Sequence, residues 1–539
     1  MYIDIVPNRN SPPAVLLRES IRQGKRILKR TVANLSHWPA ARIEAFRRLL
    51  KGQLDHLAAE APICGPVFGI LFVLKQIADT LGLTAACGRQ RLGKLALFLV
   101  LARVAHKGSR LSAVRWAKTQ AVEEILATGA FNEDDLYASL DDLAQRQAQI
   151  ESALYQRYVQ RLGEVPTLFL YDVTSSYLEG QHNELAAFGY DRDGKKGKMQ
   201  IVIGLLTDTT GHPIAVRVYM GETADPTTVA DRIEELKQQF KVQQVVLVGD
   251  RGMIKLSGKQ RLGEEGWCYI TALTDPQIRR LLKQDRLQMS FFEERICEVE
   301  AEGLRYILRR NGQVQAKEVH RLEDKLGKLR SKMEQRNAQV RESPRCQPEA
   351  GLRALQGWAQ RHKISGVVQL SLRQGEIELA IDEAARQQAL LLAGCYVIET
   401  NVAKKDLDAE TVHARYKDLA QVERDIRTLK TGLLEVRPIF LRNGERTRGH
   451  VLVCMLALIL VREMERRLKA VFGTTDEDPH TVTLPDALNQ LGRLCLQHYQ
   501  VDGKIVLTQL PQPDEEQSKI LEALQVSWPK WKCRQEVAT

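Results

Sequence analysis

The spacing of short apolar runs between residues 167 and 249 constrains the fold more than any other part of the chain. Three runs come first, and the tight turn Asp208-Thr-Thr-Gly211 joins the second to the third, which predicts an antiparallel hairpin. A helix follows, with Asp225 as its N-cap and Pro226 in its first turn, and leads into a fourth run. A crossover helix of this kind places the fourth strand parallel to the first. The expected elements span residues 167–171, 200–206, 213–219, 225–240 and 244–249.

An aspartate directly follows each of the two strands that should be parallel: Asp172 after the first and Asp250 after the fourth. Parallel strands end at the same edge of a sheet, and open α/β sheets hold their sites at that edge. Because aspartate is also common in the turns that follow strands, either residue alone carries little weight. The pair at matching ends predicts a functional site in an α/β fold, with a mixed sheet flanked by helices.

A later helix, residues 416–430, carries two patterns. Apolar residues at three- and four-residue steps predict a buried stripe. Tyr416, Glu423 and Lys430 are each seven residues apart, close to two turns, so they share one face. Arg427 stands one turn beyond Glu423, so a solvated Glu–Arg pair is the simpler interpretation, whereas the two aspartates favour a third acid of one site. The stripe consists of Leu419, Val422, Ile426, Leu429 and Leu433.

Composition and net charge limit which binding partners and which cellular compartment are expected. The chain has 539 residues and a formal net charge of +11, and a basic balance favours polyanionic partners such as nucleic acid. The alternative is a protein that is merely basic. The nine cysteines are scattered and form no Cys-x-x-Cys motif, which disfavours a zinc ribbon and fits a reducing compartment. Without a signal pattern, and with apolar runs too short for a membrane span, we expect a cytoplasmic protein.

The patterns divide the chain into six segments. An insertion domain interrupts the core and contains a hairpin around Gly303, a long helix near 315–341 and a strand pair near 367–381. The tail should hold helices near 485–498 and 515–524. The segments are a β meander (1–33), a mainly helical DNA-binding region (34–162), the first part of the core (163–275), the insertion domain (276–394), the second part of the core with the glutamate helix (395–475) and a helical tail (476–539).

Two groups of cations lie outside the core pattern. For the first group the functional interpretation is a domain that reads DNA sequence, and for the second it is a row of contacts with DNA phosphates; in each case the alternative is an ordinary solvated surface. The first group, in the helical region, is Lys107, Arg110, Arg115 and Lys118; the second forms a stripe along the long insertion helix and consists of Lys317, Arg321, Lys325, Lys328, Lys332 and Arg336.

The residues around the three acids resemble the DDE transposases of bacterial insertion sequences, in particular the group with a Tyr-Arg-Glu-Lys signature. The resemblance covers roughly residues 165–465, and the order and spacing of its short motifs are more specific than any single motif. The signature arginine would stand at position 419, where this chain has leucine, so Arg415, Arg424 or Arg427 could take its role. The motifs are Leu170-Tyr-Asp172-Val-Thr-Ser-Ser, Gly221-Glu-Thr-Ala-Asp225, Val248-Gly-Asp250-Arg-Gly-Met253, Tyr416-(x6)-Glu423-(x6)-Lys430 and Arg446-Thr-Arg-Gly-His450.

This resemblance implies an RNase H-like core and a two-metal-ion reaction on DNA. Asp172, Asp250 and Glu423 would hold two Mg²⁺ ions, with Mn²⁺ as a substitute, and Asp172 would bridge them. Tyr416, Arg427 and Lys430 would contact DNA. The partners would be double-stranded transposon ends and target DNA, and the active complex would be a homodimer.

Three alternatives stay open on the sequence alone. The first is an RNase H-like nuclease that cleaves without joining strands. The second is a non-catalytic DNA-binding regulator derived from a transposase, and the third is a structural protein that is merely basic.

Overall fold

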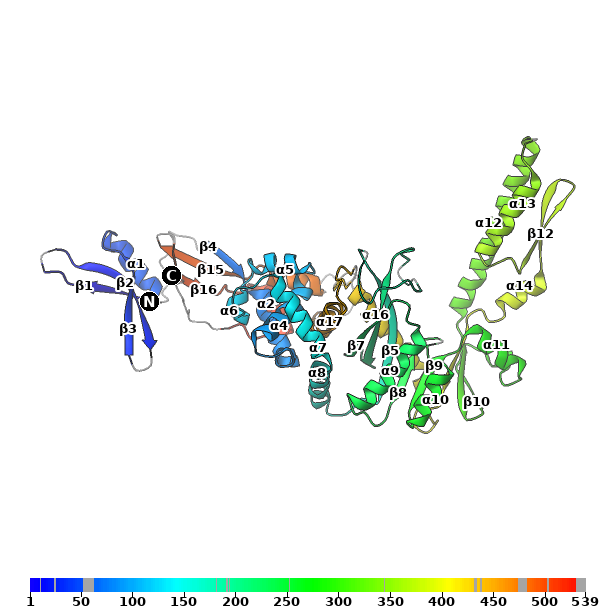
Figure 1. Cartoon of the computed structure of the whole chain (residues 1–539), viewed down its shortest axis with the longest axis horizontal. Coiled ribbons are helices and arrows are strands. Elements are labelled where there is room, and N and C mark those ends of the chain that lie inside the picture. The colour runs from blue at the N-terminus through cyan, green and yellow to red at the C-terminus, as the bar shows by residue number, and fades with distance from the viewer. Residues whose placement is uncertain are drawn as a thin grey trace. The chain divides into compact units, whose positions relative to one another are not determined.

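The chain forms two compact units, each built from segments that are not consecutive in the sequence (Figure 1). One unit comprises Met1–Thr80, Gly108–Glu133 and Glu463–Thr539, and the other Leu81–Lys107 and Asp134–Arg462. We call them the terminal unit and the core unit and describe each by itself. The computed structural model describes residues 1–9, 11–23, 26–51, 63–180, 182–190, 192, 194–251, 253–343, 345–430, 434–436, 439–473, 482–501 and 504–529.

The core unit is organised around one eight-stranded mixed sheet with the order β10-β11-β14-β9-β8-β5-β6-β7. The hairpin of β6 and β7 is antiparallel, and β8 runs parallel to β5, so both predictions for this part of the sheet are confirmed. The strands are β5 (Leu168–Tyr177), β6 (Gln200–Asp208), β7 (Pro213–Tyr219), β8 (Val246–Gly249), β9 (Cys268–Ala272), β10 (Cys297–Ala301), β11 (Leu304–Arg310) and β14 (Cys395–Thr400).

Close packing fixes β5 against its neighbour β6. All nine residues of β6 are buried, as expected for a strand inside a sheet covered on both faces. A Cβ atom on Gly204 would lie 2.3 Å from the hydroxyl oxygen of Tyr171, so only glycine leaves room for that ring. Tyr171 belongs to a core cluster with side chains of α8 (Gln147–Leu162), α9 (Asp225–Gln238) and α10 (Leu256–Glu264). Asp172, the next residue of the strand, projects to the opposite face.

The first strand is longer than predicted, and Asp172 lies within it rather than at its end. The parallel pairing of β5 with β8 stops at Tyr171 and Gly249. The antiparallel pairing with β6 continues from Asp172 to Tyr177, and this second partner keeps the strand extended. A strand can therefore end for one neighbour and continue for the other.

The predicted helix 416–430 is two helices. α15 (Ala409–Lys417) and α16 (Leu419–Lys430) are separated at Asp418, so Tyr416 and Glu423 lie on different helices. The side chain of Asp408 caps α15 by accepting a hydrogen bond from the amide of Thr411. Leu433, the last member of the predicted stripe, lies outside the described residues.

The helix that follows begins earlier than residue 451. α17 (Gly444–Phe472) includes the whole motif 446–450. Its start is capped by Asn443, whose side-chain oxygen accepts a hydrogen bond from the amide of Arg446 at 3.0 Å. No helix among the described residues is long and apolar enough to cross a membrane.

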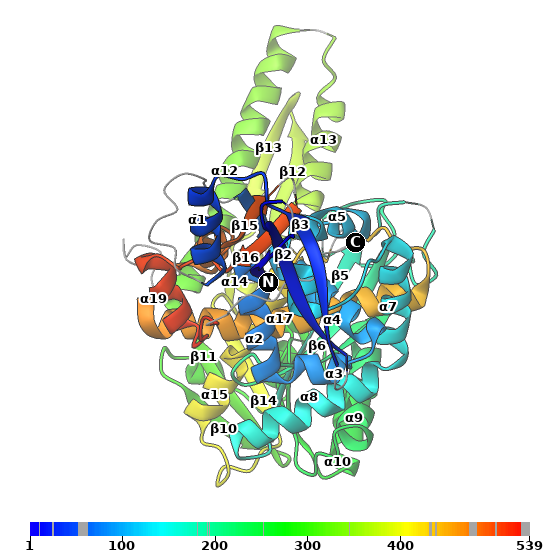
Figure 2. The same ribbon diagram turned by 90° about the vertical axis from the view of Figure 1, so that its left-hand side faces the viewer.

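The predicted insertion is split between the sheet and a separate cluster. The expected hairpin is present as β10 and β11, but β11 pairs with β14 and so extends the main sheet. The rest packs around its own apolar core, and Figures 1 and 2 show the hairpin of β12 and β13 beside two long helices. These elements are α12 (Gly312–Glu342), α13 (Pro348–Arg361), β12 (Val368–Arg373) and β13 (Glu376–Ile381), and the nearby helices are α11 (Asp275–Lys283) and α14 (Glu383–Leu390).

Helices fill most of the region before the core sheet. The expected meander at the N-terminus is an antiparallel sheet of β1 (Tyr2–Val6), β2 (Ala14–Gln23) and β3 (Arg26–Asn34), and the turn at residues 24–25 lies outside the described residues. The helices are α1 (Ala40–Leu50), α2 (Gly69–Leu81), α3 (Leu83–Cys87), α4 (Arg91–Ala105), α5 (Arg110–Ala117), α6 (Val122–Leu126) and α7 (Glu133–Gln145).

The tail is not wholly helical. α18 (Leu484–Leu491) and α19 (Glu515–Ala523) enclose two strands, β15 (Cys495–Val501) and β16 (Lys504–Gln509), so the predicted helix 485–498 is wrong in its second half. β15 pairs with β4 (Ile63–Val67), and the three strands make a small sheet. The partner strand lies more than 400 residues away in the chain and contains glycine and proline, so no local pattern announced it.

Candidate active site

Asp172 and Asp250 lie side by side across the edge between β5 and β8. Tyr171 and Gly249 form the last parallel pair of these strands, and the two aspartates occupy the next position of each chain. The carbonyl oxygen of Asp250 accepts hydrogen bonds from the Thr271 hydroxyl at 3.2 Å and the Met253 amide at 3.0 Å, which holds the backbone at the strand end. The predicted pairing of the two acids therefore follows from the strand register.

Asp172 lies in an unfavourable environment for a negative charge. The pKa of this half-buried carboxyl is raised to about 7. Burial is the largest cause and the carboxylates of Asp250 and Glu423 add to it, whereas the Val173 amide and Arg192 lower the pKa. The Val173 amide donates to Oδ1 at 2.7 Å. The three predicted acids thus lie within electrostatic reach of one another, and we call them the acid site.

Helix α16 presents Glu423 away from its buried side. The helix packs on β5 and β6, and Leu419, Val422 and Leu429 are buried, so the described part of the predicted stripe lies in the core. Asp425, also fully buried, forms an ion pair with Arg462 of α17. An acid inside an apolar stripe requires such a partner, and the pair fixes the rotation of α16. Sequence reasoning missed Asp425, although its place in the stripe was a usable signal.

Tyr416 reaches the acid site from α15. Its hydroxyl donates a hydrogen bond to Oδ1 of Asp250 at 3.3 Å. Burial raises the pKa of Tyr416 well above its usual range, and the carboxylates of Asp250 and Glu423 add to this effect. The phenol is therefore neutral at physiological pH and available as a hydrogen-bond donor to the carboxylate.

The other two predicted DNA-binding residues lie along α16. Arg427 is exposed one turn after Glu423, and Lys430 is half-buried at the last position of the helix. Leu419, the position of the signature arginine, is buried in the core. Of the alternative arginines, Arg415 forms an ion pair with Asp418 at 2.9 Å, whereas Arg424 is exposed next to Glu423.

Sequence reasoning also missed Arg192, which lies in the segment between β5 and β6. Its guanidinium pairs with Asp225 and lowers the pKa of Asp172. Asp225 is the first residue of α9, and Ala224 occupies the N-cap position, so the predicted capping role of Asp225 is wrong. The carboxylate is held by Arg192 instead. Four cations near Tyr190 in the sequence, Arg192, Lys195, Lys196 and Lys198, were the available signal.

The donor set suits a hard divalent cation. All three acids offer carboxylate oxygens, which are the ligands that Mg²⁺ prefers, and their mutual repulsion would be relieved by a cation. Among the described residues, no group of three His, Cys, Asp or Glu side chains lies close enough to hold one ion by itself.

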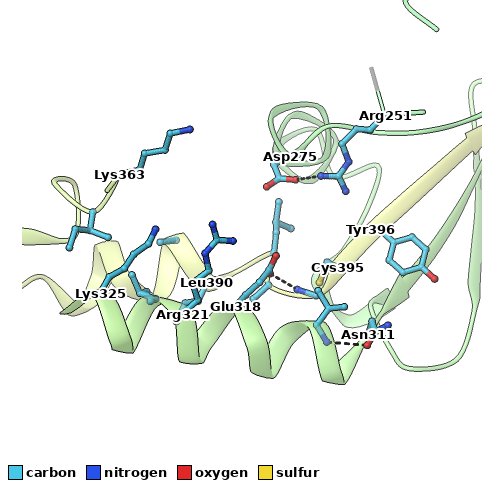
Figure 3. A pocket seen from close by; sticks show the side chains of 17 residues that line it. Arg251, Asp275, Asn311, Glu318, Arg321, Lys325, Lys363, Leu390, Cys395 and Tyr396 are labelled. Atoms are coloured by element: carbon cyan, nitrogen blue, oxygen red, sulfur yellow. Dashed lines mark hydrogen bonds and ion pairs between the residues drawn. The ribbon is translucent and has the colours of Figure 1, made fainter. Parts of the chain in front are cut away.

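A cavity of about 420 Å³ is lined in part by Arg251, the residue that follows Asp250 (Figure 3). Arg251 lies on one side of it and forms an ion pair with Asp275 at 3.1 Å. Figure 3 shows Arg321 and Lys325 rising from α12 on the other side, with Lys363 nearby. These cations come from the predicted basic stripe and its surroundings, so part of the stripe faces a concave surface.

The other cations of the stripe and those of the helical region do not form one exposed basic surface. Lys328 of α12 forms an ion pair with Asp324 at 2.7 Å. In the helical region Arg115 and Lys118 are exposed, but Arg110 is buried, so it does not belong to an exposed basic surface.

Comparisons with known proteins identify the family of the chain. Residues 163–460 match the family model of the transposase DDE domain, and residues 3–62 match that of the N-terminal domain of IS1634 family transposases. No curated protein matches the chain. Among solved structures, a cryo-EM structure of the piggyBac transposase synaptic complex with hairpin DNA is similar at 10% identity and a TM-score of 0.36, covering 74% of this chain and 69% of that chain. The first match covers more than half of the chain and contains all three acids, and the chain therefore belongs to the family of DNA transposases with an RNase H-like DDE domain.

Proposed function

We propose that Asp172, Asp250 and Glu423 are the catalytic acids with which this transposase cleaves DNA at the ends of its insertion sequence and joins them to target DNA. The observation that carries the proposal is the register of β5 and β8. It sets Asp172 beside Asp250 directly after the last parallel pair, while Glu423 lies near enough to raise the pKa of Asp172.

Two Mg²⁺ ions fit the chemistry that these carboxylates would support, with Mn²⁺ as a substitute. Asp172 would contact both ions, and Asp250 and Glu423 would each contact one. Bound there, the ions would stabilise charge on the attacking and leaving oxygens of the phosphodiester. DDE transposases use divalent metal ions in general; the number and the ligands are our proposal.

Each reaction step exchanges one P–O bond for another. In cleavage, a water oxygen attacks phosphorus and the bond to the 3′-oxygen breaks, which leaves a 3′-hydroxyl and a 5′-phosphate. In joining, that 3′-hydroxyl attacks a phosphorus of the target and the target's own 3′-oxygen leaves. Tyr416 would orient Asp250 through its 3.3 Å hydrogen bond throughout both steps.

DNA contacts of the glutamate helix complete the proposal. Arg427 and Lys430 would bind phosphates along α16, and Tyr416 would also border the transposon end. This keeps three positions of the Tyr-Arg-Glu-Lys signature. For the arginine we propose Arg427 rather than Arg415, because Arg415 pairs with Asp418 on the same stretch of chain.

The remaining parts of the chain have proposed roles at a coarser level. Residues 34–162 would bind the transposon ends, the insertion would follow the DNA beyond the acid site, and two copies would bring two ends together. Action in the cytoplasm is supported by the cysteines, since all eight that the structure describes are free thiols.

Substitution of the acids tests the proposal. Asp172→Asn and Glu423→Gln should abolish cleavage of labelled transposon-end duplex in Mg²⁺, by about a thousandfold or more, because several kcal/mol of transition-state stabilisation are lost. Binding of the same duplex in a gel-shift assay should change little. The matched control is Glu410→Gln, an exposed acid in the first turn of α15.

The outcomes separate the proposal from its alternatives. Cleavage by Asp172→Asn at the wild-type rate would falsify the assignment. Cleavage by the wild type without joining, in an assay with supercoiled target plasmid, would identify a nuclease instead.

A further inference from the structure

The antiparallel sheet near the N-terminus ends in a two-stranded hairpin, drawn in dark blue in Figure 1. β1 pairs only with residues 14–18 of β2, whereas the pairing of β2 with β3 continues to residues 23 and 26. Among the described residues, no third strand joins the hairpin beyond residue 18. We call this two-stranded part, residues 19–23 and 26–30, the ribbon.

The apolar side chains of the ribbon lie outside the core of their unit. Closer to β1, Leu17 is buried in a cluster with residues of α1, and Val32 packs against it. In the ribbon, Ile21, Ile27 and Leu28 are 40%, 66% and 48% exposed. A pair of strands without further packing is only marginally stable in water. Exposed apolar side chains on such a pair indicate a surface that binds a partner.

These three side chains lie near the end of the ribbon and on both of its faces. Ile21 is directly opposite Leu28, and Ile27 is opposite Arg22. Because successive residues of a strand point to opposite faces, Ile21 and Leu28 share one face and Ile27 lies on the other. Paired strands are only about 4.8 Å apart, so the end is narrow. Its shape suits a groove rather than a flat surface.

Positive charge accompanies this apolar end. From Arg18 to Arg30 the sequence has six Lys or Arg residues and one acid, Glu19. Arg18 and Arg30 form ion pairs at 2.8 and 3.4 Å, whereas Lys29 is exposed. An excess of cations next to an apolar end favours a polyanionic partner.

Double-stranded DNA is a polyanion that uses both features. Proteins that bind the minor groove insert Ile, Leu or Met side chains between base pairs, and their cations hold the neighbouring phosphates. Base edges in the major groove are read mainly by hydrogen bonds, which Ile and Leu side chains do not form. An anionic membrane would contact one face of the ribbon, whereas its apolar side chains lie on two.

We propose that the ribbon is a further DNA-binding element, which inserts Ile27 and Leu28 between base pairs from the minor groove and bends the duplex. Lys29 holds a neighbouring phosphate, and Ile21 supports Leu28 across the ribbon. The contact depends on unstacking and not on hydrogen bonds to base edges, so it is independent of base sequence. It goes beyond the proposed function, which assigns end binding to residues 34–162, and rests on that function only in taking DNA as the partner.

Energy transfer between dyes at the two ends of a short duplex measures the bend. The duplex has about 30 base pairs, no transposon-end sequence and a central TA step, because such steps are kinked easily. Saturation with the full chain should increase the energy transfer, since bending brings the two ends closer. The double variant Ile27→Ala with Leu28→Ala should lose this increase, and its affinity should fall on the order of tenfold.

Two comparisons make the result specific to the inserted side chains. Ile5→Ala is the matched control, because it shortens an isoleucine that is 51% exposed on β1 of the same sheet, outside the ribbon. This variant should bend the duplex like the wild type. Ile27→Met with Leu28→Met should also retain the bend, because methionine can be inserted between base pairs.

The cation is tested by the salt dependence of binding. Lys29→Gln should keep the increase in energy transfer but reduce the slope of log affinity against log salt by about 0.9, as expected for one lost phosphate contact. All proteins in these assays carry Asp172→Asn, and the buffer contains EDTA. Bending is therefore measured without cleavage and does not depend on the catalytic assignment.

Three results would overturn the inference. The first is energy transfer that does not rise with the wild type, or that rises equally with the double alanine variant. The second is a loss of binding to anionic phospholipid vesicles in that variant with bending intact, which would assign the ribbon to a membrane. The third is a loss of its self-association in sedimentation with bending intact, which would assign the ribbon to a second copy. Failure of the catalytic proposal is recognised separately, by cleavage that survives Asp172→Asn.

Discussion

The acid site and the basic helix α12 each bring side chains of like charge together, but the surroundings of those charges differ. Around Asp172 two further carboxylates lie near enough to raise its pKa, and burial raises it more. On α12, Lys328 pairs with Asp324 at 2.7 Å and lowers the pKa of that acid, while Lys325 donates to the carbonyl of His362 at 3.0 Å. The acids around Asp172 repel one another, whereas Lys328 and Lys325 of the second group each have a partner that carries negative charge or partial negative charge.

The difference separates a site from a surface. Like charges gathered in a half-buried place destabilise the metal-free fold, so their presence needs a reason, and a bound cation supplies one. Compensated charges on an exposed helix are the usual state of a solvated face and contribute little to stability. Arg321 and Lys325 of α12 line the cavity, so this part of the helix is neither a half-buried group of like charges nor a fully exposed face.

Apart from substitution of the acids themselves, the largest effect should come from breaking the hydrogen bond to Asp250. Tyr416→Phe removes the hydroxyl that donates to this carboxylate at 3.3 Å but keeps the ring. Loss of such a supporting contact typically lowers metal affinity or activity about 10–100-fold. We expect cleavage of labelled ends to fall within that range, with partial recovery at high Mn²⁺. A variant that cleaves like the wild type would show that the contact has no part in the site.

A smaller effect concerns the stability of the metal-free protein. Asp172 has a raised pKa of about 7 in the fold against an ordinary value of 3.8, so its ionised form destabilises the fold above pH 7. As the pH falls from 7 toward 4, the folded state takes up a proton and this cost disappears. Asp172→Asn should therefore raise the melting temperature in EDTA by a few degrees at pH 8, and by less at pH 5.

Calorimetry in EDTA at the two pH values is the measurement. Asp324→Asn serves as the control, because that exposed acid has a lowered pKa and lacks the repulsion. An equal shift of the Asp172→Asn melting temperature at both pH values would contradict the account of the acid site.

The smallest effect should come from α12 itself. Arg321→Glu with Lys325→Glu changes two cations at the cavity, and Lys328→Glu with Lys332→Glu is the matched change farther along the predicted stripe. Each lost phosphate contact reduces the slope of log affinity against log salt by about 0.9. We expect a reduction of about one to two for the first pair and less than one for the second. If both pairs of variants and the wild type show the same slope of log affinity against log salt, the whole stripe is a solvated face that does not contact DNA.

The sequence was most informative where local pattern and strand register coincide. Asp172 and Asp250 could be paired in advance, because a crossover helix makes their strands parallel and places the following residues together. Glu423 was added because the two aspartates favoured a third acid and because the surrounding motifs resemble those of DDE transposases. The pairing of the aspartates uses periodicity and connection rules, whereas the choice of Glu423 also needed the resemblance.

Other features depend on contacts that periodicity does not encode. The break at Asp418 moves Tyr416 to a separate helix, and the two helices contact different strands, α15 contacting β8 and β9 and α16 contacting β5 and β6. Pairing of β4 with β15 joins distant ends of the chain. Arg192 reaches the site from a connection without regular structure, and the extension of β5 beyond Tyr171 depends on its second neighbour.

The central claim is that three carboxylates converge to hold two divalent ions on DNA. Electron paramagnetic resonance of Mn²⁺, titrated into the complex of the protein with transposon-end DNA, counts those ions directly. The account predicts two tightly bound Mn²⁺ per chain in the wild type, and the loss of both in Asp172→Asn, because that residue would contact each ion. Equal Mn²⁺ binding by the wild type and Asp172→Asn would contradict it.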